Sequence, residues 1–251
     1  MKRHFQSRGH LWKKVAIVAF LLTQATSFFL YGNGFSRSYP LKEVAKSSEC
    51  RKMKWNELSD DCKQPLPIIH GANYGAYKDN PAYTSIYTTM WGAPYDNGWA
   101  VGQGAHQGVD IVSSEGTPVY SVEDGLIVKA RAHPGYGNVI MIKHTMENGK
   151  VVFSIYGHLK HIYALENTTI KEGDLIGTVG NEGYSFGNHL LWDINITPTN
   201  TFAFWGCPEY GNGSFNAIAN VVNNGLCRDY LLQRTVDPIT WVETQGGTLA
   251  L

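Results

Sequence analysis

The feature that most constrains the fold is the stretch Gly187 to Thr197, in which apolar and polar side chains alternate. An alternation of period two is typical of a β-strand, because successive side chains point to opposite faces. One face carries Leu190, Trp192, Ile194 and Ile196; the other carries His189, Leu191, Asp193, Asn195 and Thr197. The first face is expected in a core and the second is available for chemistry. Leu191 is the exception, since it places an apolar side chain on the polar face.

Further short strands bounded by turns are predicted over residues 106–112, 119–122, 126–132, 138–144, 150–159 and 175–179. The tripeptides Glu123-Asp124-Gly125 and Glu147-Asn148-Gly149 are typical of tight turns and predict two hairpins. A high content of glycine (27) and tyrosine (14) also favours a turn-rich β protein over a helical bundle. After this region, a short helix is expected within 221–232 and a final strand or turn within 236–242.

The N-terminus has the pattern of an export segment. Basic residues precede an apolar run that begins at Val15, and the small residues Ala25 to Ser27 could serve as a cleavage site. If it is not cleaved, Val15–Tyr31 is barely long enough for a bilayer, which needs roughly 20 residues. Residues 1–31 are therefore predicted to be a signal peptide or a membrane anchor. The rest of the chain is expected outside the cytoplasm (in the periplasm or cell envelope, or secreted), with membrane contact only through this segment.

Four cysteines in an exported chain indicate two disulfides. Pairing Cys50 with Cys62 and Cys207 with Cys227 is the simplest of the three possible connectivities, and the sequence leaves the other two open. Neither spacing is that of a zinc knuckle, so metal binding by cysteine is the less favoured interpretation.

The chain is predicted to divide into four parts. Residues 1–31 are the export segment, 32–72 a linker or disulfide-tied extension, 73–200 the main β domain, and 201–251 a disulfide-containing extension packed on that domain. The start of the main domain, residues 73–99, is rich in aromatic side chains. They could line a sugar or peptide groove, although packing over a β core is the commoner use of such residues.

The balance of charges indicates which classes of partner the chain can attract. Basic and acidic residues are equal at 21 each, so no electrostatic argument favours nucleic acid. A hydrophobic content of 43% supports a folded core rather than disorder.

Four side chains near predicted strand ends could carry chemistry. His106 and Asp110 would lie about 13 Å apart in a straight strand, but Gly108 between them permits a bend that could bring both to one metal ion. His158 and His189 each lie on the polar face of a strand. Any one of these histidines is more often an ordinary hydrogen-bonded residue. Their joint placement is what indicates a site.

At this point the chain resembles the M23 peptidases, the lysostaphin or LytM-type zinc endopeptidases of bacterial cell walls. The matching segments are His106-Gln-Gly-Val-Asp110-Ile, Glu115-Gly-Thr-Pro-Val-Tyr120, Asp124-Gly-Leu-Ile-Val128, Gly135-Tyr-Gly-Asn138, Tyr156-Gly-His-Leu159, Gly173-Asp-Leu-Ile-Gly177 and Gly187-Asn-His-Leu190. The resemblance implies an all-β fold, an antiparallel two-sheet sandwich of the LytM/lysostaphin (duplicated hybrid motif) type with an open groove.

The family's site uses a His-x-x-x-Asp motif and a later His-x-His motif, together with a histidine from a Tyr-x-His-Leu segment. The resemblance implies that His106 and Asp110 are zinc ligands and that His158 and His189 are the catalytic histidines. Leu191 stands where the family has its third ligand. Asp193 matches a non-ligand acidic position of the family.

The absence of the third ligand leaves three hypotheses about the function of the chain. The first is a catalytically degenerate protein of the cell envelope that binds peptidoglycan or regulates a cell-wall hydrolase, with weak or absent zinc. The second is an active Zn²⁺ endopeptidase that cleaves peptidoglycan peptide cross-links with an unconventional third ligand. His133, His144 and His161 could supply that ligand only if the fold happened to bring them in. A purely structural envelope protein is the third hypothesis, and nothing in the sequence favours it. Whether the chain is an enzyme stays open at this stage.

Overall fold

The computed structural model describes residues 38–70, 73–210 and 214–244. All of them belong to one compact unit, Ser36–Leu251. The predicted signal peptide or anchor, residues 1–31, lies outside the described residues. Within the described ranges, no helix combines the length and apolar character needed to cross a bilayer.

Strands dominate the described structure, and the helices are short. The strands are β1 (Glu43–Ala45), β2 (Lys63–Pro65), β3 (Tyr87–Thr89), β4 (Gly108–Val112), β5 (Pro118–Tyr120), β6 (Gly125–His133), β7 (Gly137–Thr145), β8 (Val151–Ile162), β9 (Thr169–Ile170), β10 (Leu175–Val179), β11 (His189–Asn195) and β12 (Thr235–Val236). The α-helices are α2 (Pro81–Thr84), α3 (Phe215–Asn223), α4 (Arg228–Leu232) and α5 (Pro238–Glu243). Single 3₁₀ turns are η1 (Cys50–Lys52), η2 (Trp55–Glu57), η3 (Asp60–Cys62), η4 (Tyr74–Ala76), η5 (Tyr95–Asn97), η6 (Phe204–Gly206) and η7 (Pro208–Tyr210).

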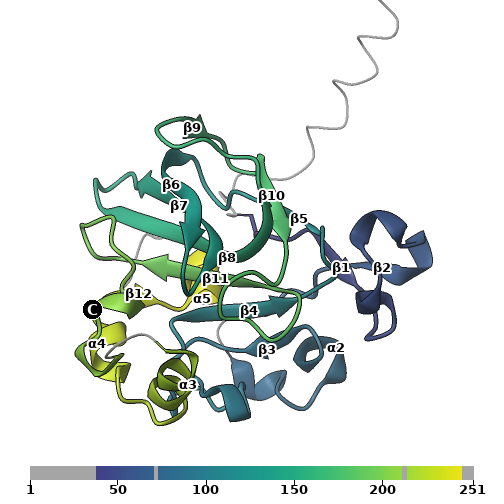
Figure 1. The fold of residues 1–251 in the computed structure, drawn as a ribbon, viewed down its shortest axis with the longest axis horizontal. Helices are drawn as coiled ribbons and strands as arrows, with labels where there is room; N and C mark the ends of the chain where they lie inside the picture. Colours follow the sequence, from purple (N-terminus) through teal and green to yellow (C-terminus); the bar gives the residue numbers. More distant parts are fainter. Residues whose placement is uncertain (1–37, 71–72, 211–213, 245–251) are drawn as a thin grey trace, which may run out of the picture. The chain divides into compact units, whose positions relative to one another are not determined.

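One large antiparallel sheet organises the unit (Figure 1). Its main order is β3-β4-β11-β8-β7-β6-β9, and β10, β5 and β12 are joined to it through β8, β10 and β11, respectively. The pair β1-β2 forms a separate two-stranded sheet. The prediction of a mostly β, antiparallel fold is confirmed. The prediction of a two-sheet sandwich needs correction, because the described strands form one ten-stranded sheet and a minor second one.

Strand β8 explains why the two expected layers are one sheet. Its first part pairs with β7 and β11, and its last residues pair with β10. Between these parts the register shifts and His158 adopts a φ of +61°, a value uncommon for a residue other than glycine. A bulged strand can bend while its hydrogen bonding continues, so β8 carries the sheet from one part of the fold to the other.

The two predicted hairpins have different outcomes. The turn at Glu147-Asn148-Gly149 joins the antiparallel pair β7 and β8, as predicted. The prediction of a hairpin at Glu123-Asp124-Gly125 is wrong, because the strands on either side of this turn do not pair with each other. Strand β5 pairs with β10, and β6 pairs with β7 and β9. Long-range contacts explain this: the Asp124 carboxylate accepts hydrogen bonds from Lys171 Nζ at 2.6 Å and from the Glu172 N–H at 2.9 Å. These bonds hold the turn beside a distant segment.

Residues 38–70 are part of the main core. Leu41, Val44, Leu66 and Ile69 are at most 5% exposed and belong to the same apolar cluster as Trp192. The segment predicted as a linker or a disulfide-tied extension is therefore tied down over these residues. Apolar burial of this extent is the dominant stabilising contribution to such a segment.

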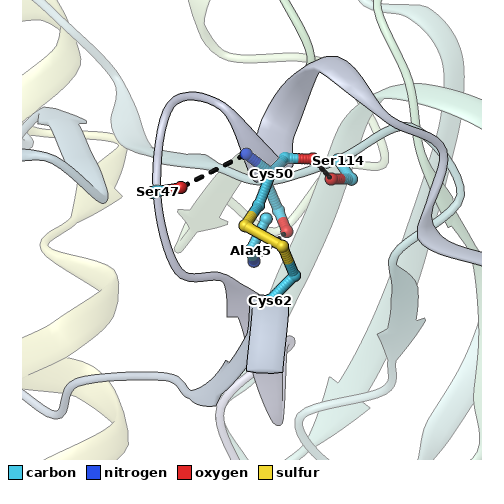
Figure 2. The surroundings of a disulfide bond; sticks show 6 residues. Ala45, Ser47, Cys50, Cys62 and Ser114 are labelled. Carbon is cyan, nitrogen blue, oxygen red and sulfur yellow. Dashed lines mark hydrogen bonds between the residues drawn. A yellow bond between two sulfur atoms is a disulfide. The ribbon is translucent and has the colours of Figure 1, made fainter. Parts of the chain in front are cut away.

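The disulfide Cys50–Cys62 closes this segment on itself (Figure 2). The Cys50 N–H donates to Ser47 Oγ, and Ser114 Oγ donates to the Cys50 carbonyl, both at 3.2 Å. The second disulfide joins Cys207 and Cys227. Both pairings are those predicted as the simplest connectivity.

Residues 214–244 are mainly helical and packed. Helices α3 and α4 pack around the Cys207–Cys227 disulfide in a second apolar cluster that also contains Ala105. The strand or turn predicted at 236–242 is corrected to β12 followed by α5. Asp237 caps α5 by accepting the Ile239 N–H at 3.1 Å, and Pro238 occupies its first turn. The Asp237-Pro238 pair is a helix-start signal, since Asp is a preferred N-cap and Pro a preferred first helical residue.

The aromatic stretch 73–99 mostly packs on the core, the commoner of the two uses considered. Tyr87 is fully buried in the main cluster. Five other rings are partly buried against that cluster: Tyr74, Tyr77, Tyr83, Trp91 and Trp99. Tyr95 differs from them, since it is 39% exposed and lines a cavity.

Candidate functional site

Strands β4, β11 and β8 lie side by side and bring together the residues predicted for a site. Asp110 on β4 is directly paired with Leu191 on β11, and Leu191 is paired on its other side with Gly157 on β8. Directly opposed residues of an antiparallel pair project from the same face. Asp110 and Leu191 therefore share one face, with His158 following immediately after Gly157.

Gly108 allows β4 and β11 to approach closely. A Cβ atom at this position would lie 2.3 Å from the carbonyl oxygen of Trp192, which is backbone and cannot swing away. His106, just before β4, then reaches Asp110, with His106 Nε2 3.3 Å from Asp110 Oδ1. The structure thus places these two side chains together, with Gly108 inside the regular register of β4 and β11.

His189 also lies beside this carboxylate. Its Nε2 atom is 3.6 Å from Asp110 Oδ1, and its Nδ1 is 2.8 Å from the Gly187 carbonyl oxygen. A carbonyl oxygen only accepts, so Nδ1 carries the proton and donates it to Gly187. The Ser185 hydroxyl also lies near Nδ1, at 3.2 Å.

His158 completes the group from β8. The centres of the His158 and His189 rings are 4.7 Å apart. His158 Nδ1 donates to the Glu182 carbonyl oxygen at 2.7 Å, and its backbone N–H donates to the Tyr136 carbonyl oxygen at the same distance. These two bonds hold the residue in its unusual backbone conformation.

The electrostatics of the group centre on Asp110. Burial alone would raise the pKa of Asp110, but the neighbouring His106 and His189 outweigh it and hold that pKa below its usual range. Burial alone would likewise lower the pKa of His106, yet the Asp110 carboxylate raises it above the usual value. Burial, followed by the adjacent His189, lowers the pKa of His158 to about 4, so His158 is neutral at pH 7.

Leu191 faces this group but packs as a core residue. Its side chain is 4% exposed and belongs to an apolar cluster with Tyr136, Val139, Met141, Phe153 and Ile155. It also lines the cavity that His106, Asp110 and His189 line. Leucine has no lone pair and can offer a ligand only apolar contact.

A cavity of about 320 Å³ opens onto these residues. Its lining is mainly apolar and aromatic, with Tyr95, Tyr184, Phe186, Val112 and Ile218 among its residues. Ile218 comes from α3, so the C-terminal extension forms part of the wall. Phe186 and Ile218 belong to no sequence motif, so the sequence did not predict them as residues of the site.

Asp193 lies outside this cavity lining although it follows Leu191 by one strand repeat. Its side chain is fully buried, and Tyr136 Oη donates to Asp193 Oδ2 at 3.4 Å. Burial raises the pKa of Asp193 to about 7, against a smaller lowering effect from His106 and Tyr136.

The other three histidines considered as substitute ligands do not line the cavity. His133 packs in an aromatic cluster with Phe202 and Trp205. His144 is 2.7 Å from Ser154 Oγ through Nε2, and His161 stacks on Tyr163. None of them replaces the side chain at position 191.

The donor set does not fit a three-ligand zinc site. Both ring nitrogens of His106 and Asp110 Oδ1 are buried without a hydrogen-bond partner among the described residues, which suits a bound cation. A catalytic zinc, however, needs three protein ligands. Across the described ranges, the one trio of His, Cys, Asp or Glu ligand atoms within 4.8 Å of one another is Cys207, Glu209 and Cys227. Two of these are joined in a disulfide, so they are not thiolate ligands.

In comparisons with known proteins, the matching part of the chain is the part that contains these site residues. The family model described as Peptidase family M23 matches residues 104–201. The DD-carboxypeptidase/endopeptidase Mpg of Neisseria meningitidis serogroup B is 39% identical over 97 residues, which are 38% of this chain and 21% of that protein. The peptidoglycan DD-endopeptidase ShyA of Vibrio cholerae is 36% identical over 91 residues, 36% of this chain and 20% of that protein.

Among solved structures, the catalytic domain of the antimicrobial peptidase lysostaphin from Staphylococcus simulans is similar, with a TM-score of 0.39 and 23% identity. The similarity covers 63% of this chain and 89% of that one. The chain spans about a fifth of the length of the curated relatives it matches.

The segment 104–201 therefore matches the M23 peptidase family, and its relatives include a DD-carboxypeptidase/endopeptidase and a peptidoglycan DD-endopeptidase. It contains β4 to β11 and all four residues of the site, whereas Tyr95 and Ile218 of the cavity lie outside it.

Proposed function

We propose that this chain is a cell-wall protein that acts outside the cytoplasm and does not itself cleave peptidoglycan. In this proposal it binds peptidoglycan or regulates a cell-wall hydrolase through the cavity of the M23 domain. The observation that carries the proposal is Leu191, an apolar side chain in the cavity wall directly paired with Asp110.

The argument rests on the number of ligands. By the family resemblance, His106 and Asp110 are the first two zinc ligands, and position 191 supplies the third. Two ligands hold zinc weakly and leave the pKa of a bound water poorly controlled. Leu191 is also integrated in an apolar cluster, so the surrounding packing supports leucine at this position.

A second function is favoured by one specific observation. His106, Asp110 and His189 line one cavity, and the His158 ring lies 4.7 Å from the His189 ring, so the four residues that the family resemblance implies lie together. A protein released from metal binding has little reason to retain all four. The alternative is therefore an active zinc endopeptidase for peptide cross-links, with His158 and His189 as the catalytic histidines and an unconventional third ligand.

The location outside the cytoplasm is supported by three features. Two disulfides are present in the structure, and such bonds persist in oxidising compartments. The relative ShyA is named a peptidoglycan DD-endopeptidase. The N-terminal residues have the composition of an export segment.

One experiment separates the two functions. The purified full chain is dialysed against zinc, its metal content is measured, and its release of muropeptides from isolated cell walls is followed, with His106→Ala as the matched variant. The proposal expects substoichiometric zinc and no release. One zinc per chain together with release that His106→Ala abolishes would establish the endopeptidase instead.

A further inference from the structure

A second cavity, of about 520 Å³, lies outside the segment that matches the M23 family. All the residues that line it fall within 74–103, whereas the family match begins at residue 104. They come from η4, from η5 and from the turns that follow these two elements. This part of the chain therefore forms a depression of its own, separate from the group around Asp110.

Two aromatic rings form part of its wall and are held in place. Tyr74 and Trp99 pack against the main core and also line this cavity. Their ring centres are 6.4 Å apart, and the ring planes are nearly perpendicular, at 83°. Tyr74 Oη donates to Asp237 Oδ2, and Trp99 Nε1 donates to the Tyr87 carbonyl oxygen at 2.7 Å. Because each polar ring atom is already bonded within the protein, the rings offer the cavity apolar surface in a fixed position.

Accessible polar groups complete the wall. Asn97 and Gln103 line the cavity and are exposed, so a ligand can reach their side-chain amides. Each amide offers two N–H donors and a carbonyl acceptor. The charged residues of the lining, Lys78 and Asp79, form an ion pair with Nζ 2.9 Å from Oδ2. Because their charges offset each other, the cavity favours an uncharged ligand that is rich in donors and acceptors.

We propose that this cavity binds an N-acetylated amino sugar of a glycan strand. A pyranose ring has a face of C–H groups, which would lie against an aromatic ring, and a rim of hydroxyls, which would bond to the amides. The N-acetyl group adds an N–H and a carbonyl that suit Asn97 or Gln103, and a methyl that suits Val101 in the same wall. The assignment of the strand to peptidoglycan rests on the proposed function.

The position of the cavity fits a polymer that carries both sugars and peptides. Tyr95 lines the M23 cavity, and Asn97, two residues further along η5, lines this one. Their Cα atoms are at most about 7.6 Å apart, because each Cα step is 3.8 Å. In peptidoglycan the peptide stems are attached to sugars of the strand, so a strand held in the second cavity would bring a stem beside the first.

The local structure favours a sugar over a peptide at this place. Within the described part of the chain, the residues that line the second cavity lie in turns and single 3₁₀ turns, not in strands. They therefore offer no strand edge with which the backbone of an extended peptide could pair.

The test uses sugars without any peptide. The full chain is titrated calorimetrically with tetra-N-acetylchitotetraose and with cellotetraose, which has the same rings and linkage but no N-acetyl groups. The wild-type chain is expected to bind the acetylated sugar about 10-fold or more tightly than cellotetraose. The double variant Asn97→Ala/Gln103→Ala should bind the acetylated sugar about 10-fold or more weakly than the wild-type chain. Asn56→Ala is the matched control, since this exposed amide in η2 does not line the cavity, and it should leave the affinity unchanged.

Thermal unfolding of each variant shows that the comparison is made on folded protein. No binding of tetra-N-acetylchitotetraose, equal affinity for the two sugars, or undiminished binding by the double variant would overturn the inference. Sedimentation with isolated peptidoglycan separates this failure from that of the proposed function. If the chain still sediments with peptidoglycan, the proposed function survives without the sugar site. If neither probe binds, the sugar site and peptidoglycan binding both fail. Sugar binding without sedimentation would support the cavity and overturn its assignment to peptidoglycan.

Discussion

Leu191 on β11 and Asp110 on β4 are directly paired across the sheet, and both line the same cavity. One is an apolar side chain continuous with a core cluster, and the other is a buried carboxylate flanked by His106 and His189. The cavity therefore has an anionic centre and an apolar neighbour where the M23 resemblance implies a third ligand. Four predictions follow from this geometry and from the surrounding fold.

Replacing leucine by histidine at position 191 tests the ligand count. Leu191→His is expected to bind zinc about 100-fold or more tightly than the wild-type chain, because a third ligand joins His106 and Asp110. Without metal, this variant should be about 1–3 kcal/mol less stable, since an imidazole enters an apolar cluster. Calorimetric zinc titration and urea unfolding measure the two effects. Leu191→Asn is the control, and a similar gain in zinc affinity there would show that polarity alone is responsible.

The close approach at Gly108 can be tested separately from the chemistry. Gly108→Ala places a Cβ atom 2.3 Å from the Trp192 carbonyl oxygen, so β4 and β11 must separate. The expected loss is about 2–3 kcal/mol in the free energy of unfolding, with weaker ligand binding because His106 and Asp110 move. Gly187→Ala is the matched control, since a Cβ there meets nothing within 4 Å. Equal stability of the two variants would contradict the role given to Gly108.

The raised pKa of Asp193 predicts that the difference in stability between the wild-type chain and Asp193→Asn depends on pH. Burial raises its pKa from 3.8 to about 7 in the folded chain. The folded state therefore holds a proton that the unfolded state has lost, and this contribution, present below pH 4, disappears as the pH rises toward 7. Relative to the wild-type chain, Asp193→Asn should become more stable between these values, by up to about 4 kcal/mol at pH 8.

Urea unfolding at pH 4, 5.5 and 8 measures this difference. The exposed Asp61 provides the control, since Asp61→Asn should change stability little at any of the three values. A difference between Asp193→Asn and the wild-type chain that is constant from pH 4 to pH 8 would show that Asp193 ionises normally.

The two disulfides should differ in their effect on the cavity. Removing Cys50–Cys62 by alanine substitution is expected to lower stability by about 3 kcal/mol, because the unfolded chain gains freedom over a short loop. Ligand binding per folded molecule should stay unchanged. Removing Cys207–Cys227 should also weaken binding, because it loosens the packing of α3, which supplies Ile218. Calorimetric titration at a temperature below the unfolding transition compares ligand binding by the two variants. Equal losses of binding in both variants would contradict the prediction that only the second disulfide supports the cavity.

Local patterns predicted the strands well where each strand carries its own signal. The alternation along β11, the strands that became β6, β7 and β8, and the turn at Glu147-Asn148-Gly149 are all set by neighbouring residues. The turn at Glu123-Asp124-Gly125 has an equally good local signal, yet its prediction failed. Its Asp124 binds Lys171 and Glu172, residues far away in the sequence, and β5 found its partner in β10.

The sequence alone determined which chemical groups are present: a histidine and an aspartate in M23-like positions (106 and 110), two more histidines on strand faces at 158 and 189, and leucine at 191. It could not determine that Leu191 joins an apolar cluster while facing Asp110, or that Tyr95 and Ile218 complete the cavity wall. Those relationships join residues that are distant along the chain. Only the packed sheet and the helices against it bring such residues within contact distance, because burial and hydrogen bonding act through space rather than along the sequence.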